Sequence, residues 1–163
     1  GAALDGMDPD LAVTGKLSGL TNSNSIVWSL DQQTLSHIDA PTKTVRAYNY
    51  YQAACAIENG RLAIDTPHTA GSPDGMAIDD QGGLWVAFCR GGTVHRLDPA
   101  TGTSTERVEF PMSGVTACAF GGSDLQTLYV TTGKFPNQEE PMNGRLFAVD
   151  VGTRGVAAFA FGG

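Results

Sequence analysis

The sequence contains no run of about 18 or more apolar residues, so no segment has the length and character of a membrane-spanning helix. Basic residues are few as well. Ten Lys and Arg stand against 17 Asp and Glu, which gives a formal net charge of −7. Nucleic acids and anionic membrane surfaces both bind clustered Lys and Arg. Neither is therefore expected as a partner.

Cysteine is also scarce. The three cysteines, Cys55, Cys89 and Cys118, are too few and too irregularly spaced for a disulfide framework or a cysteine-based zinc site. Cys89 and Cys118 fall within expected strands, where a buried free thiol acts as a small hydrophobic group. Three reduced thiols are typical of a cytoplasmic protein, which is the expected location.

Long stretches of helical periodicity are missing, whereas the chain has 21 glycines and eight prolines. This combination indicates an all-β fold rich in tight turns. A pattern of four short strands recurs three times, opened in turn by Asn24, Asp74 and Thr116. The openings are 74 − 24 = 50 and 116 − 74 = 42 positions apart. Repeats of this length with four strands each predict the blades of a β-propeller.

We expect one domain over residues 1–163, built from about three four-stranded blades. A leading segment (1–23) contributes one outer strand at 11–17, and residues 1–10 are expected to be loose. The blades follow at 24–65, 66–110 and 111–163, the last of them ending in a strand at Val156–Phe161. The longest interior loop, Gly133–Asn143, is expected to form a flap over one face.

The repeat also predicts a site, because the first strand of each propeller blade lines the central channel. Asn24, Asp74 and Thr116 should then lie near the axis at one level, with Asp39–Ala40, Arg90–Gly92 and the flap on the same face. Carboxylate and amide oxygens are hard ligands that suit Ca²⁺, Mg²⁺ or Mn²⁺ and are acceptable to Zn²⁺. Asp74 could serve as metal ligand or general base. The alternative is that Asn24 and Asp74 are only turn residues.

Several motifs resemble the SMP-30/gluconolactonase/regucalcin family. They are Ser23–Ser29, Ser72–Met76, Leu84–Ala87, Val94–Pro99 and Phe120–Gly122 with Leu128–Thr131. The resemblance implies a six-bladed propeller with a divalent metal, foremost Ca²⁺, that hydrolyses sugar lactones. The family's metal-binding Asn matches Asn24. Its metal-binding Asp, which is also the proposed general base, matches Asp74.

The chain resembles only the C-terminal half of that family, so the family's metal-binding Glu has no counterpart. Ser25 replaces the usual Gly after the Asn ligand. Three blades cannot close a ring, and open strand edges invite association. We therefore expect a homodimer or a complementing half-propeller as partner. The three histidines, His37, His68 and His95, are interpreted as packing or surface residues.

The repeat and the motifs lead to two functions of different classes. The first is a metal-dependent lactone hydrolase with a small-molecule lactone as substrate. Its activity in this chain alone is expected to be weak or absent and to depend on self-association. The alternative is a non-catalytic half-propeller that binds metal or a protein partner. Trp28 and Trp85 are expected to be buried between blades rather than to bind substrate.

Overall fold

A computed structural model describes residues 1–136 and 139–160 of the chain. Over these ranges the strands form four antiparallel sheets, and the helical segments are two single 3₁₀ turns, η1 (Ala40–Thr42) and η2 (Gln52–Ala54). The predicted all-β fold is confirmed. None of the helices described is long and apolar enough to cross a membrane.

Each sheet is built from strands that follow one another in the chain. A hairpin joins β1 (Ala2–Met7) to β2 (Val13–Leu20). The first four-stranded sheet contains β3 (Ser23–Trp28), β4 (Thr34–Asp39), β5 (Thr44–Tyr51) and β6 (Ala56–Asp65). The second contains β7 (Ser72–Ile78), β8 (Leu84–Cys89), β9 (Thr93–Leu97) and β10 (Ser104–Glu109). The third contains β11 (Val115–Gly121), β12 (Thr127–Thr132) and β13 (Leu146–Asp150).

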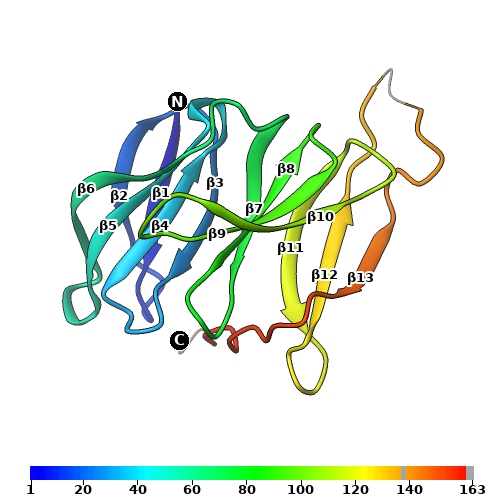
Figure 1. Cartoon of the computed structure of the whole chain (residues 1–163). Coiled ribbons are helices and arrows are strands. Elements are labelled where there is room, and N and C mark those ends of the chain that lie inside the picture. The colour runs from blue at the N-terminus through cyan, green and yellow to red at the C-terminus, as the bar shows by residue number, and fades with distance from the viewer. Residues whose placement is uncertain (137–138, 161–163) are drawn as a thin grey trace.

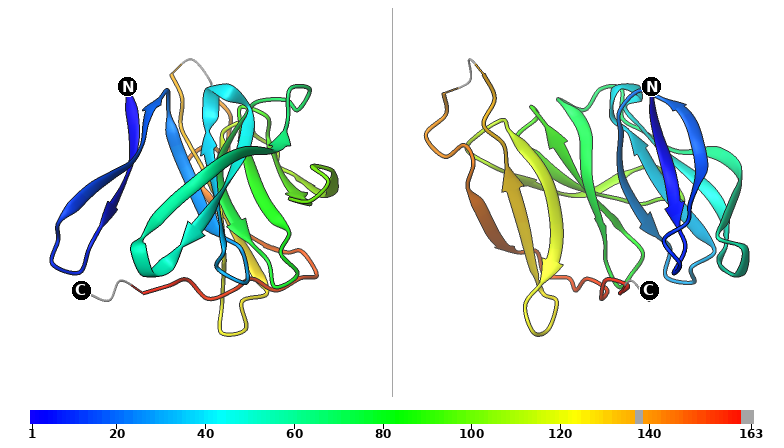
Figure 2. Two further views of the ribbon diagram at one scale, coloured as in Figure 1. Left: turned by 90° about the vertical axis from the view of Figure 1, so that its left-hand side faces the viewer. Right: turned by 180° about the vertical axis from the view of Figure 1, so that it is seen from behind.

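The sheets stand side by side in an open arc (Figures 1 and 2). Strand β7 contacts both β3 and β11, so the first strands of successive sheets line the inner side of the arc. One polar link joins two of them, because the hydroxyl oxygen of Ser25 accepts a hydrogen bond from the backbone N–H of Met76 at 2.9 Å. This arrangement is that of consecutive blades of a β-propeller.

Strand β8 explains how the core is divided. Its residues Leu84–Phe88 are all buried, which is why this stretch is continuously apolar rather than alternating. Val86 and Phe88 pack toward the first sheet, together with the buried side chains Ile38, Val45, Ile64 and Met76. Trp85 and Ala87 pack toward the third sheet, with Val94, Val115, Leu128 and Val130. The second sheet is thus the layer that joins the other two.

A carboxylate at the end of β7 fixes Trp85 in this core. Asp79 is fully buried, and its oxygens accept hydrogen bonds from the Trp85 indole N–H at 2.9 Å and the Arg96 Nε–H at 2.6 Å. The backbone N–H groups of Gln81 and Gly83 bind the same carboxylate at 3.0 and 2.8 Å. These donors lower the pKa of Asp79 against the desolvation that would raise it.

The prediction that residues 1–10 are loose is wrong. Ala2–Met7 forms strand β1, whose side chains alternate between half-buried and exposed. The connection is tight, with the Leu11 N–H bonded to the Asp8 carbonyl at 2.8 Å. Ala and Gly have low strand propensity, so the sequence of β1 carries little local signal. Pairing with β2 determines its conformation.

The predicted strand at Val156–Phe161 is also wrong for residues 156–160, whereas Phe161 lies outside the described residues. Backbone bonds turn the chain away from the free edge of β13. The Asp80 N–H bonds to Arg154 O at 2.8 Å, and the Gly155 N–H bonds to Leu125 O at 2.9 Å. Residues 156–160 then run beneath the inner strands (Figure 1).

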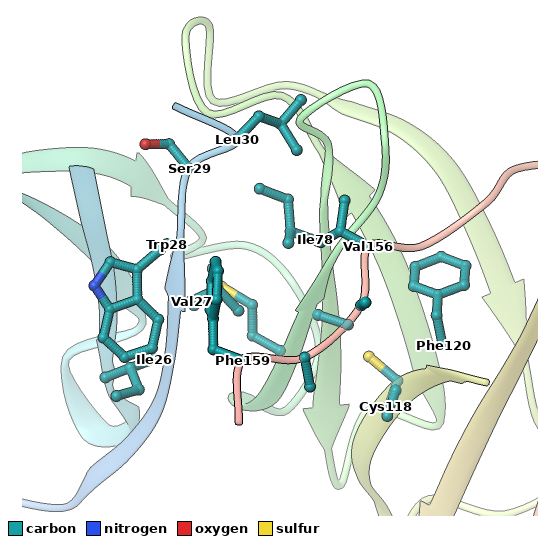
Figure 3. Close-up of a pocket in the computed structure, with 15 residues that line it drawn as sticks. Ile26, Val27, Trp28, Ser29, Leu30, Ile78, Cys118, Phe120, Val156 and Phe159 are labelled. Carbon is teal, nitrogen blue, oxygen red and sulfur yellow. The ribbon is translucent and has the colours of Figure 1, made fainter. Parts of the chain in front are cut away.

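The two tryptophans differ in environment. Trp85 is 0% exposed, as predicted. Trp28 is only half-buried, and its ring lies edge-on to Phe159 at 6.2 Å. The two rings border an apolar cavity of about 370 Å³ together with Val27, Met76, Ile78 and Phe120 (Figure 3). The residues expected to form an outer strand thus place Phe159 against Trp28 at this cavity instead, and the prediction that Trp28 is buried between blades is wrong.

Candidate metal and catalytic site

The three positions that open the repeats all lie at β-bulges. In the first sheet, Ser23 pairs with Asp39 and Ile26 with His37, so β3 has one residue more than β4. In the second sheet, Pro73 pairs with Phe88 and Met76 with Val86, which gives β7 the same extra residue at Asp74–Gly75. The third sheet repeats the irregularity at Thr116, between Val115 and Ala117. Bulges of this kind redirect side chains and are common beside functional sites.

Close packing explains the glycine in the second bulge. A Cβ atom on Gly75 would lie 2.4 Å from the Cβ of Ala117 and 3.0 Å from the carbonyl oxygen of Thr116. The inner strands β7 and β11 therefore approach each other at a point where only glycine fits. This contact holds Asp74 at the inner edge of the arc.

The structure brings Asn24 and Asp74 together. Asp74 is half-buried, and the side chain of Asn24 is close enough to act on the pKa of its carboxylate. Burial raises the pKa of Asp74 above the ordinary value of an aspartate, while the bonds from Asn24 and Cys89 act in the opposite direction. Neither of these two donors carries a positive charge. The carboxylate is consequently held in place by neutral groups.

Cys89 is the residue that sequence reasoning missed at this site. Burial and the negative charge of the nearby Asp74 carboxylate both raise the pKa of its thiol. Cys89 pairs with Ser72 across β7 and β8, and Ser72 and Asp74 lie two residues apart on β7. The signal was present in the strand order, since the end of a second strand lies beside the start of the first.

Thr116 does not join this group. Its hydroxyl bonds within its own sheet, to the Thr131 carbonyl at 3.1 Å and the Thr131 hydroxyl at 2.9 Å. Asp39, expected on the same face, is buried, and its carboxylate accepts the backbone N–H groups of Thr21 at 3.0 Å and Asn22 at 2.7 Å. Asp39 therefore fixes the chain that leads into Asn24 instead of presenting a ligand.

The histidines remain outside the site, in line with their interpretation as packing or surface residues. His37 is fully buried, with Nε2 at 2.9 Å from the Ser23 hydroxyl, and burial lowers its pKa. His95 lies against the Phe88 ring, with a centroid distance of 4.9 Å. His68 is exposed on the loop before β7.

The long loop is anchored near the same end of the sheets as Asp74. The Glu140 carboxylate accepts bonds from the Ser113 N–H at 2.9 Å and the Ser113 hydroxyl at 3.1 Å. The Phe135 ring lies 5.4 Å from the Arg90 guanidinium, and Arg90 directly follows Cys89. Figure 1 shows this loop rising at the end of the sheets where β7 begins. Residues 137–138, at its centre, lie outside the described part of the chain.

The donor set can be compared with the needs of a metal ion. Within residues 1–136 and 139–160, no three His, Cys, Asp or Glu side chains are grouped for metal binding. The amide of Asn24 and the carboxylate of Asp74 nevertheless converge, and the Cys89 thiol contacts the same carboxylate. Two oxygen donors and one sulfur donor fit a divalent cation that keeps open positions for water or substrate.

Comparison with known proteins agrees with this geometry. The family model described as "SMP-30/Gluconolactonase/LRE-like region" matches residues 1–134. Regucalcin of Xenopus laevis is 36% identical over 161 residues, which cover 95% of this chain and 54% of that protein. A luciferin-regenerating enzyme superposes with a TM-score of 0.88 at 28% identity, covering 95% of this chain and 53% of the other.

A further solved structure supports the fold. The calcium-binding protein regucalcin of Agrobacterium tumefaciens matches with a TM-score of 0.87 at 24% identity, over 94% of this chain and 54% of its own. The molecule is thus an arc of β-propeller blades. The chain belongs to the SMP-30/gluconolactonase/LRE-like family. It spans about half the length of the relatives it matches.

Proposed function

We propose that this chain is a divalent-metal-dependent hydrolase of sugar lactones, or the metal-binding portion of one. The observation that carries the proposal is the contact between Asn24 and Asp74 at two successive bulges on the inner strands. Membership of a family named for gluconolactonase supports the substrate class. The calcium-binding relative supports a divalent cation as cofactor.

Asn24 would contribute its amide oxygen to the cation and Asp74 one carboxylate oxygen. A bound cation would supply charge to polarise the lactone carbonyl. Asp74 has the second role of accepting a proton from the attacking water at its other oxygen. Its half-buried position at the bulge on the inner side of the arc suits this role. The Asn24 amide orients the carboxylate for both roles.

The non-catalytic alternative is favoured by a different observation. The outer edge of β13 and both edges of the β1–β2 hairpin have no strand paired to them in the described chain. Exposed apolar side chains gather at the same two ends of the arc, namely Met7, Leu11, Val13 and Leu146. Such ends suit association with a second copy or with a complementing half-propeller. Under this proposal the chain binds metal or a partner without turnover.

Lactone hydrolysis distinguishes the two functions. Purified chain is assayed with a lactone panel and added Ca²⁺, Zn²⁺ or Mn²⁺ across a dilution series, while its mass in solution is measured. We expect activity that rises with self-association and is lost in Asp74→Asn, with Thr116→Ala as the matched control because the Thr116 hydroxyl bonds within its own sheet. No hydrolysis at any concentration, with metal still bound, would favour the alternative.

Localisation follows from the sequence only. The cysteines described in the structure, Cys55, Cys89 and Cys118, are free. Free thiols are usual in reducing compartments, so a cytoplasmic location remains a prediction. Fractionation of cells that express the protein would test it.

A further inference from the structure

The three sheets provide an internal comparison at the position next to each bulge. The residues paired across the start of the bulges are Ser23 with Asp39, Pro73 with Phe88 and Val115 with Thr132. The residues that follow the second member of each pair are Ala40, Cys89 and Gly133. Of these three equivalent positions, only the one beside Asp74 carries a side chain with a donor atom.

The strand register directs this side chain toward Asp74. Cys89 and Ser72 are directly opposite in the β7–β8 ladder, so their side chains lie on one face of the sheet. Asp74 lies two residues beyond Ser72, and side chains two positions apart on a strand share a face. The pKa of the Cys89 thiol, which burial and the charge of Asp74 both raise, agrees with this placement.

We propose that Cys89 is a third ligand of the Asn24–Asp74 site and that its sulfur makes the site prefer thiophilic cations, Zn²⁺ and Cd²⁺, to Ca²⁺. The inference rests on the proposed metal site and extends it to the identity of the ion. Ca²⁺ takes oxygen ligands, whereas cysteine sulfur selects softer ions. A donor set of amide oxygen, carboxylate oxygen and sulfur combines the ligand types of a zinc site that keeps an open position.

The other two cysteine thiols, those of Cys55 and Cys118, have surroundings that differ from those of Cys89. Cys118 is buried, bonds to the Trp85 carbonyl at 3.1 Å, and has a pKa raised to about 12. Cys55 follows η2, and its Sγ lies near Gly6 of β1. Both thiols are thus engaged away from the inner strands that carry Asn24 and Asp74. A cation bound by both a sulfur atom and a carboxylate at this site would therefore have Cys89, and not Cys55 or Cys118, as its sulfur ligand.

The test is titration of the metal-free full chain with Cd²⁺, Zn²⁺ and Ca²⁺. Binding of Cd²⁺ to a cysteine produces an ultraviolet charge-transfer band, and calorimetry gives the affinity of each ion. We expect the band in the wild type and in Cys55→Ser, and its loss in Cys89→Ser. Loss of a ligand should weaken Cd²⁺ and Zn²⁺ binding by at least about tenfold, by analogy with the effect of removing even outer-shell groups. Ca²⁺ binding should be nearly unchanged.

The outcomes separate this inference from the proposed function. Cd²⁺ binding that needs Asp74 but gives no band, or a band that persists in Cys89→Ser, would overturn the role of Cys89 and leave the metal site intact. Binding of Ca²⁺ more tightly than Zn²⁺ in the wild type would likewise overturn it. Absence of binding by all three ions would overturn both. Circular dichroism verifies that Cys89→Ser and Cys89→Ala are folded. The alanine variant carries the same residue as the equivalent position of the first sheet, Ala40.

Discussion

Two aspartates five residues apart, Asp79 and Asp74, have opposite environments. Asp79 is 0% exposed, but two side-chain donors, one of them the Arg96 cation, and two backbone N–H groups bind its oxygens and lower its pKa. Asp74 has only the neutral donors Asn24 and Cys89, so the effect of its partial burial prevails and raises its pKa. Burial alone therefore does not set the state of a carboxylate. The charge and number of its donors decide it.

The comparison also separates structure from function. The carboxylate oxygens of Asp79 already accept hydrogen bonds from groups that hold the second sheet together, so they have no acceptor position left for a ligand. Asp74 lies at a bulge on the inner side of the arc, where the groups that bind it are neutral. When the donors around a carboxylate are neutral, a bound cation stabilises its charged form. The same residue type is thus a structural element in one case and a candidate ligand in the other.

The largest expected effect is that of Asp79→Asn. This change removes the buried partner of Arg96, whose side chain is only 13% exposed, and leaves it the exposed Glu106 at 3.7 Å. Removal of one member of a buried pair costs about 3–5 kcal/mol, and we expect the lower end because Arg96 reaches water. Urea denaturation measures the free energy of unfolding.

Asp98→Asn is the control for that experiment. Asp98 lies in an exposed turn, where its carboxylate accepts bonds from the Ala100 N–H at 2.8 Å and the Thr101 hydroxyl at 2.9 Å. Its replacement should cost much less. Equal losses in the two variants would show that the Asp79 network contributes nothing beyond an ordinary turn.

The candidate site shows which features could be predicted from the sequence and which could not. That Asn24 and Asp74 lie close together could be predicted because both open a four-stranded repeat, and repeats place equivalent residues at equivalent points of a propeller. Their role as ligands stays a prediction. Cys89 could not be predicted from its own neighbours, since Leu84–Phe88 is a continuous buried run and a cysteine at its end resembles one more core residue. Only the register between β7 and β8, with its bulge, brings the thiol to the carboxylate.

The fold shows the same limit. Strand β8 was predictable because apolar residues mark it directly. Strand β1 was not, because its alanines and glycine signal no strand and only the partner β2 makes one. The tail at 156–160 has strand-like composition but no strand partner. The bonds from the Asp80 N–H to the Arg154 carbonyl and from the Gly155 N–H to the Leu125 carbonyl turn it beneath the arc. The local sequence pattern predicts which residues are able to form a strand. It does not predict which distant segment of the chain will pair with those residues or hold them in another conformation.

A smaller effect is expected from His37. Burial lowers its pKa below the usual value of about 6.5, although the nearby Asp39 opposes the shift. Below about pH 6.5 the unfolded chain therefore binds a proton at this histidine that the folded protein does not bind. The free energy of unfolding should fall as the pH drops below that value. In His37→Gln this slope should become smaller, and the part that remains is that of His95, whose pKa burial also lowers. The loss of stability below about pH 4 that arises from Asp79 should remain. Denaturation curves from about pH 7 down to below about pH 4 measure both effects. An unchanged slope would assign it to other groups.

The smallest effect is expected from Asp74→Asn in metal-free buffer at neutral pH, and it tests the comparison most directly. Because burial disfavours the ionised carboxylate, the neutral amide should be tolerated, with a change in unfolding free energy of no more than about 0.5 kcal/mol. Asparagine can still bond to Asn24 and Cys89. Added Zn²⁺ or Ca²⁺ should then raise the melting temperature of the wild type but not of the variant. A loss of stability as large as that in Asp79→Asn would make Asp74 a structural residue, and the main support for a metal site would be gone.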